Sequence, residues 1–181
     1  MSSRAEVLQQ DQYSSQVLSP DPKKHDLKFW ILTWVPAAIA IAIIATESTS
    51  MMGADHTTHW LRPIWQRFFG ALPDDDWESL HWKIRKCGHI LGYGGVSLGF
   101  FLSWYRSLRA SISATRKGFF QRASALAMVS TILLASADEF HQLFLPNRGA
   151  SVHDVALDTI GGMLAQLGLA AIYFSRREKA E

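Results

Sequence analysis

The chain has 181 residues, of which 48% are hydrophobic and 19% charged, and its 18 Lys and Arg residues nearly balance its 16 Asp and Glu residues. The basic residues adjoin apolar runs, which membrane orientation explains more economically than nucleic-acid binding. The single cysteine, Cys87, excludes an intramolecular disulfide and a cysteine-based metal site.

The N-terminal part of the chain changes abruptly from polar to apolar. The first 27 residues are rich in Ser, Gln and Asp, which predicts a disordered cytoplasmic tail over 1–27. The following segment, 29–46, contains no ionisable residue and is close to the length that crosses a bilayer. A soluble helical bundle would show recurrent charges on one face of such a helix. We therefore expect 29–46 to be a membrane-spanning helix, kinked at Pro36.

The acidic link from 47 to 83 contains an amphipathic pattern. Large apolar side chains recur there at the spacing of one helical face, at Trp60, Leu61, Ile64, Trp65, Phe68, Phe69 and Leu72. The segment is too short and too charged to span a membrane, with Arg62 and Arg67 on its polar side. We expect an amphipathic helix over about 59–71 that lies in the outer membrane interface.

Three further apolar blocks predict three further spans, at 87–105, 123–145 and 155–174. Close helix packing is expected in two of them, because small residues recur at Gly88, Gly92, Gly94, Gly95 and Gly99 and at Gly161, Gly162, Ala165 and Gly168. The sequence thus predicts an all-α, four-transmembrane-helix bundle over 28–175, with an interfacial helix in its first outer loop and a short tail at 176–181.

The basic residues set the expected orientation of these spans. They are Lys23, Lys24 and Lys28 before the first span, Arg106, Arg109, Arg116, Lys117 and Arg122 between the second and third, and Arg176, Arg177 and Lys179 after the fourth. The positive-inside rule makes these three segments cytoplasmic. Both termini are therefore expected in the cytoplasm, and the link 47–83 and the turn 146–153 outside.

Polar and ionisable side chains gather at the outer ends of three spans. The set comprises Lys86, His89 and Tyr93 on one helical face, Asp138, Glu139 and Gln142 in the last two turns of 123–145, Arg148 and Ser151 in the turn, and Asp154 and Asp158 at the start of the fourth span. A charged side chain near a bilayer centre costs about 2.5–3.5 kcal/mol. We therefore expect these groups to face one another in a polar pocket.

Several members of this set also have structural explanations. Ser151-x-x-Asp154 is a capping box, which by itself would account for both residues. Arg148 would neutralise neighbouring acids, Lys86 would mark the interface and Tyr93 would anchor packing.

Three members resist such explanations, namely His89, Asp138 and Glu139. A helix end does not need two adjacent acids within a membrane. We interpret the two carboxyl groups as an acid or base and His89 as a partner in proton transfer. These three are the predicted catalytic residues.

The same residues resemble the VanZ-like family of small bacterial membrane proteins. The resemblance lies in Lys86-x-x-His89-x-x-x-Tyr93-x-x-x-Ser97 and, more specifically, in Asp138-Glu139-x-x-Gln142-x-Phe144-x-Pro146-x-Arg148-x-x-Ser151-x-x-Asp154, which leads to Gly161 and Gly162. It covers about 29–174. Where the family pattern usually has Asn, this chain has Asp158, which adds a negative charge to the site.

The resemblance implies a four-helix protein of the bacterial inner membrane and, for the founding member, low-level resistance to the glycopeptide teicoplanin. It implies no settled reaction. No repeat or broken helix favours a transporter. No cofactor is required by the sequence, and a Mg²⁺ ion bridging Asp138, Asp154 and Asp158 would lack a recognised ligand spacing.

Three functions are compatible with the sequence. The first is an enzyme that acts on a lipid-linked sugar or phosphate of the cell envelope. The second is a protein that binds an envelope lipid or an amphiphilic glycopeptide without chemistry. The third is a bundle whose acids are simply paired. In the first two, the expected ligand-binding residues are Lys86, Tyr93, Gln142, Arg148, Ser151, Asp154 and Asp158. The sequence predicts no oligomeric state.

Overall fold

The computed structural model describes residues 17–18, 25–49, 52–145 and 149–178. These residues form, in chain order, β1 (Val17–Leu18), α2 (Leu27–Glu47), α3 (Ala54–Phe69), α4 (Asp74–Ser111), β2 (Ala114–Thr115), α5 (Arg116–Gln142) and α6 (Val152–Glu178). The predicted all-α class is confirmed for this part of the chain. Most of the expected disordered tail lies outside the described residues, as does Arg148.

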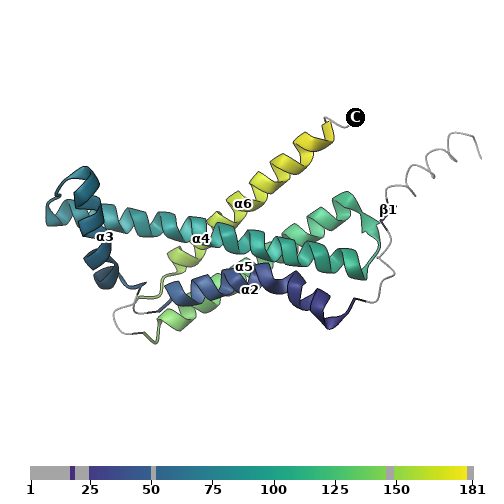
Figure 1. Ribbon diagram of the computed structural model, residues 1–181, viewed down its shortest axis with the longest axis horizontal. Helices are drawn as coiled ribbons and strands as arrows, with labels where there is room; N and C mark the ends of the chain where they lie inside the picture. Colours follow the sequence, from purple (N-terminus) through teal and green to yellow (C-terminus); the bar gives the residue numbers. More distant parts are fainter. Residues whose placement is uncertain (1–16, 19–24, 50–51, 146–148, 179–181) are drawn as a thin grey trace, which may run out of the picture.

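Helix α4 is the central element, and α2, α5 and α6 all pack along it (Figure 1). Glycines permit the closest approaches, as the small-residue pattern predicts. A Cβ atom added at Gly99 would lie 2.8 Å from the carbonyl oxygen of Pro36, and one at Gly161 would lie 2.3 Å from that of Ile90. Other glycines of the pattern, such as Gly88 and Gly168, face open space. The approach at Gly161 brings the start of α6 against α4.

Three described helices, α2, α5 and α6, are long and apolar enough to cross a membrane. Most of their side chains face outward rather than into the bundle. On α2, for example, Ile31, Ile39 and Ile43 are each more than half exposed. A surface of this kind matches a lipid solvent better than water.

Helix α4 extends well beyond the expected second span of 87–105 and is not one of these three apolar helices. It begins at Asp74, directly after Pro73, and its first turn holds three aspartates. Carboxylates stabilise a helix N-terminus through the helix dipole, so the local sequence explains this early start. Helix α3 ends where Gly70 adopts a φ of 91° and lies beside this N-terminal part of α4 (Figure 1).

The helix ends segregate to the two ends of the bundle (Figure 1). One end holds α3, the start of α4, the end of α5 and the start of α6. The opposite end holds the start of α2 and the basic segment 106–122, in which α4 ends and α5 begins. There β1 and β2 pair antiparallel, Val17 with Thr115 and Leu18 with Ala114. The expected site residues that the structure describes lie toward the α3 end of the bundle, in α4, in the last turns of α5 and at the start of α6.

Candidate functional site

Two polar contacts join α4 to α6 near the α3 end. Lys86 Nζ donates to Asp154 Oδ1, and His89 Nδ1 lies 3.0 Å from Asp158 Oδ1. The two aspartates are one helical turn apart, so the contacts lie one above the other. Asp158 is completely buried, and the side chains of Lys86 and His89 are about a quarter and a fifth exposed. The predicted convergence of these four residues is therefore present.

A second buried contact joins α4 to α5. The Tyr93 hydroxyl and the Gln142 side-chain amide both donate to Asp138 Oδ2, each at 3.2 Å. All three side chains are buried. Asp138 thus joins two helices, and this predicted catalytic residue is only 9% exposed.

Glu139 points from the end of α5 to the start of α6. Its Oε2 atom accepts a hydrogen bond from the backbone N–H of Ser151 at 2.7 Å. Its Oε1 atom is buried and has no hydrogen-bond partner among the described residues, and the same is true of Asp158 Oδ2. A buried oxygen without a donor is costly. A bound proton would satisfy either atom.

The expected capping box at the start of α6 is only half formed. Ser151 Oγ accepts a hydrogen bond from the backbone N–H of His153 at 3.2 Å, as an N-cap residue does. The Ser151 N–H, which the box would pair with Asp154, donates to Glu139 instead. The Asp154 carboxylate contacts Lys86. Capping thus explains Ser151 but leaves Asp154 to be explained by the contact with α4.

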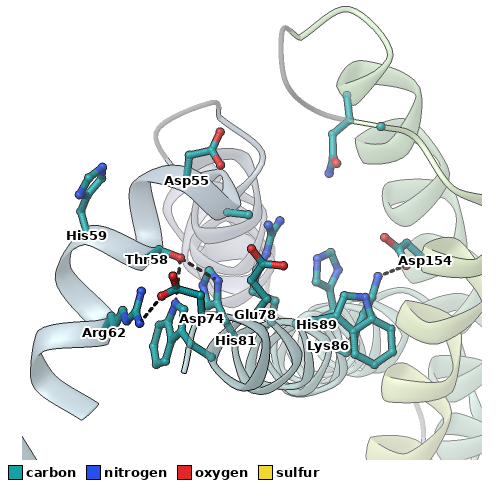
Figure 2. Close-up of a pocket in the computed structure, with 16 residues that line it drawn as sticks. Asp55, Thr58, His59, Arg62, Asp74, Glu78, His81, Lys86, His89 and Asp154 are labelled. Atoms are coloured by element: carbon teal, nitrogen blue, oxygen red, sulfur yellow. Dashed lines mark hydrogen bonds and ion pairs between the residues drawn. The ribbon is translucent and has the colours of Figure 1, made fainter. Parts of the chain in front are cut away.

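A pocket of about 800 Å³ opens between α3, the first turns of α4 and the adjoining ends of α5 and α6 (Figure 2). Four of the predicted site residues line it, namely Lys86, His89, Gln142 and Asp154. The other described members do not line the pocket; these are Tyr93, Asp138, Glu139, Ser151 and Asp158. Arg148 lies outside the described residues. The predicted site therefore divides into a pocket surface and a buried polar layer.

A protein-family model described as VanZ/LLP1 matches residues 14–173, which is most of the chain. This chain belongs to the VanZ/LLP1 family. The resemblance expected from the two motifs is thereby confirmed, and together with the three apolar helices it identifies a multi-pass membrane protein. Searches of curated proteins and of solved structures found no match.

In this VanZ/LLP1 protein, α3 and the extension of α4 as far as Arg85 contribute half of the pocket, and none of their lining residues was among the predicted site residues. These lining residues are Ala54, Asp55, Thr58, His59, Arg62, Asp74, Trp77, Glu78, His81, Trp82 and Arg85. The sequence did contain a signal for the extension. Pro73 followed by three acids is a helix start, and Trp77, His81, Arg85 and His89 recur every fourth residue, which places them on one face.

His81 and Trp77 are the two buried residues of this second half. The His81 Nε2 atom lies 3.0 Å from Thr57 Oγ1 and its Nδ1 atom 3.1 Å from Thr58 Oγ1. The Trp77 ring stacks on the imidazole, with ring centroids 5.5 Å apart. Burial, and then the positive charge of Arg85, lower the pKa of His81 below its ordinary value. His81 is therefore a neutral imidazole at neutral pH.

The pocket holds three strongly basic side chains with different surroundings. Arg62 pairs with Asp74 at 2.6 Å, and Lys86 pairs with Asp154. Arg85 has no ion-pair partner within the described part of the chain and is only partly exposed. Its guanidinium group can bind an anion without first losing a carboxylate. Within the described ranges, no three His, Cys, Asp or Glu residues are placed to hold a metal ion.

Proposed function

We propose that this VanZ/LLP1 protein spans the bacterial inner membrane four times and binds, in an outward-facing pocket, the anionic head group of a lipid-linked envelope component. The proposal has three parts, namely the number of spans, the orientation, and the ligand. Each is supported by a different observation.

The span that the three apolar helices leave to be assigned is the second in chain order, residues 87–105 in the central part of α4. Its polar side chains Tyr93, Ser97 and Ser103 are buried against the other helices, whereas its exposed side chains include Leu91 and Leu102. An apolar outer face around a polar, well-packed inner face suits a helix that lies beside three lipid-exposed helices. This helix is less apolar than α2, α5 and α6 because it lies between them and exposes less of its surface to lipid.

The orientation follows from the distribution of charge. The segment 106–122, which runs from the last turns of α4 to the first turns of α5, contains five basic residues and no acid. It lies at the end of the bundle opposite to α3 (Figure 1). The positive-inside rule assigns this segment, and with it both termini, to the cytoplasm. The pocket then opens on the outer side of the membrane.

Helix α3 would lie in the outer interface beside the pocket. Four of its large apolar side chains, Trp60, Ile64, Phe68 and Phe69, are at least half exposed. In water this face would be unfavourable, whereas in the outer membrane interface it would contact acyl chains. A lipid could then place its chain against the bundle and its head group in the pocket.

The observation that carries the ligand assignment is Arg85, because the structural alternative does not account for it. Paired contacts explain Lys86, His89, Tyr93, Asp138 and their partners as a bundle-stabilising network. They do not explain a guanidinium that lines a pocket of ligand-binding size without a carboxylate partner among the described residues.

The anion that suits this position is a phosphate, which a guanidinium binds through two parallel hydrogen bonds. The exposed carboxylates of Asp55 and Glu78 also line the pocket. They would accept hydrogen bonds from hydroxyl or amino groups of the same head group, such as those of a lipid-linked sugar. An amphiphilic glycopeptide is the alternative ligand for this pocket.

A second candidate function, acid–base catalysis, is favoured by the contact between His89 and Asp158. If Asp158 accepts the Nδ1 proton, the Nε2 atom of a neutral His89 is left as a base at the pocket surface. Such a base could take a proton from a water molecule or from a hydroxyl group of the bound head group.

The ligand assignment is tested by mass spectrometry of the lipids that copurify with the protein. We expect a phosphate-bearing lipid with the native protein and its loss with Arg85→Ala. Arg67→Ala is the matched control, because Arg67 is an exposed arginine of α3 that does not line the pocket. Equal lipid profiles for the native protein and the Arg85 variant would contradict the proposal, and recovery of a glycopeptide alone would favour the alternative occupant.

A further inference from the structure

The pocket is lined by two tryptophans, and packing accounts for only one of them. Trp77 is 2% exposed, its ring stacks on His81, and the Cζ atom of Arg62 lies 5.9 Å from the ring centroid. Because Arg62 belongs to α3, these contacts pack α3 against α4. Trp82 also lines the pocket but is 60% exposed. A large aromatic ring left open at a pocket surface is typical of a ligand contact.

The orientation of the Trp82 ring is restricted by contacts that reach α6. Lys86 Nζ lies 5.7 Å from the ring centroid, which is a cation–π contact, and the same Nζ atom donates to Asp154. The ammonium group thus lies over one face of the indole. Since Trp82 nevertheless remains mostly exposed, the ring is held in place and is still accessible to a ligand.

Three groups of different chemistry follow one another along the pocket face of α4. Glu78, Trp82 and Arg85 are related by steps of four and three residues, so they share one face of the helix, and all three line the pocket. At 1.5 Å per residue, the step from Glu78 to Arg85 covers about 10 Å. Glu78 lies nearer to the start of α4 at the α3 end, and Arg85 lies nearer to the rest of the bundle (Figure 1).

This order matches the order of groups in a lipid-linked sugar, whose chain lies in the membrane, whose phosphate lies at the surface and whose sugar extends outward. A guanidinium such as that of Arg85 binds the phosphate. The indole of Trp82 would contact the flat face of C–H bonds that a pyranose ring presents. The exposed Glu78 carboxylate, with that of Asp55 from α3, would accept hydrogen bonds from sugar hydroxyl groups (Figure 2). A head group without a ring would leave the indole uncovered.

An exposed tryptophan near a membrane surface can also be an interfacial anchor. Trp60 on α3 has the surroundings for that role alone, because it is 52% exposed and does not line the pocket. Trp82 differs from Trp60 in its position between a carboxylate and a guanidinium that line the same pocket. Trp60 is therefore the matched control for Trp82.

We propose that Trp82 is the sugar-binding residue of the pocket and that the ligand is a lipid-linked glycosyl phosphate. The sugar ring stacks on the Trp82 indole, the phosphate binds Arg85, and sugar hydroxyl groups bind Glu78 and Asp55. The position of the phosphate rests on the proposed function, whereas the sugar deepens that function by naming the group attached to the phosphate.

Two short-chain isoprenyl phosphate diesters test this assignment with the full chain in detergent. One probe carries a β-glucosyl group on its phosphate and the other carries a methyl group, so both have the same lipid chain and the same single negative charge. We expect the native protein to bind the glucosyl probe about tenfold more tightly, a gain of the order that stacking of one nucleic-acid base on an aromatic side chain produces.

Four variants locate the origin of this preference. Trp82→Ala should weaken binding of the glucosyl probe alone and so abolish the preference, and Trp82→Phe, which keeps a smaller ring, should retain part of it. Trp60→Ala should keep the native preference. Arg85→Ala should weaken binding of both probes by the same factor. The affinity for the methyl probe shows in each Trp82 variant whether the rest of the pocket is intact.

The results distinguish a failure of this assignment from a failure of the proposed function. If the native protein binds the two probes equally, or if Trp82→Ala keeps the preference, the sugar assignment is wrong and the phosphate assignment stands. If Arg85→Ala binds both probes as tightly as the native protein, the phosphate assignment is wrong, and a preference that is lost in Trp82→Ala still supports the sugar assignment. If neither probe binds the native protein, both assignments are wrong.

Discussion

The Glu139 carboxylate accepts a hydrogen bond from the backbone N–H of Ser151, so a residue at the end of α5 occupies the place of the acid that would complete the cap of α6. This exchange of partners leaves Asp154 to contact Lys86 on α4. Two helix-joining contacts thereby arise where a capping box would have given one contact within a single helix.

Replacing Glu139 separates its structural from its chemical contribution. Glu139→Gln keeps an oxygen that accepts from Ser151 and removes a buried charge, so its thermal stability in detergent should equal or exceed that of the native protein. Glu139→Ala leaves the Ser151 N–H without this acceptor and should cost about 1–3 kcal/mol. Equal destabilisation by both variants would contradict this assignment of the hydrogen bond.

The contact between Lys86 and Asp154 should show strong coupling. Both side chains are mostly buried, so removing one partner leaves the other charged and poorly solvated. Lys86→Met alone should destabilise the protein by about 1–3 kcal/mol, and Lys86→Met with Asp154→Leu should recover much of that loss. A double-mutant cycle of unfolding free energies measures the coupling, and strictly additive effects would exclude it.

The approach of α6 to α4 depends on Gly161. A methyl group there would lie 2.3 Å from the carbonyl oxygen of Ile90, so backbone atoms must move. Gly161→Ala should destabilise the protein by about 1–3 kcal/mol and separate His89 from Asp158. Gly168→Ala on the same helix is the matched control, because nothing lies within 4 Å of its added Cβ atom and alanine favours a helix. Equal melting temperatures for the two variants would show that the close approach is unimportant.

The helical elements were predictable where one physical signal dominated. Long apolar runs predicted helices that became α2, α5 and α6, and steps of three and four residues predicted that Lys86, His89 and Tyr93 share a face. The early start of α4 was missed because the charged residues between Asp74 and Lys86 contradict an apolar span, although Pro73 and the three aspartates favour a helix start.

Which residues belong to the site was easier to predict than which of them form hydrogen bonds or ion pairs with one another. Ser151 and Asp154 match a local capping rule, but Lys86, which is 68 residues from Asp154 in sequence, competes successfully for the carboxylate. A pattern of spacing along one helix contains no information about such a tertiary partner. For the same reason the contribution of Thr58 and Arg62 to the pocket could not be anticipated from the amphipathic pattern of α3 alone.

His89 provides the test that distinguishes catalysis from binding. His89→Gln keeps a side-chain amide that can donate to Asp158, so the fold and the affinity for a phosphate-bearing lipid should be retained. It removes the imidazole that would accept a proton at the pocket surface. If the protein is an enzyme, single-turnover conversion of the copurifying lipid should fall by about 10²–10⁴-fold in this variant while binding is unchanged. Asp158→Asn keeps an acceptor for the Nδ1 hydrogen of His89 but removes the negative charge, and should give a smaller loss of turnover. If the native protein forms no product from a lipid that it binds, the catalytic candidate is wrong and the function is binding.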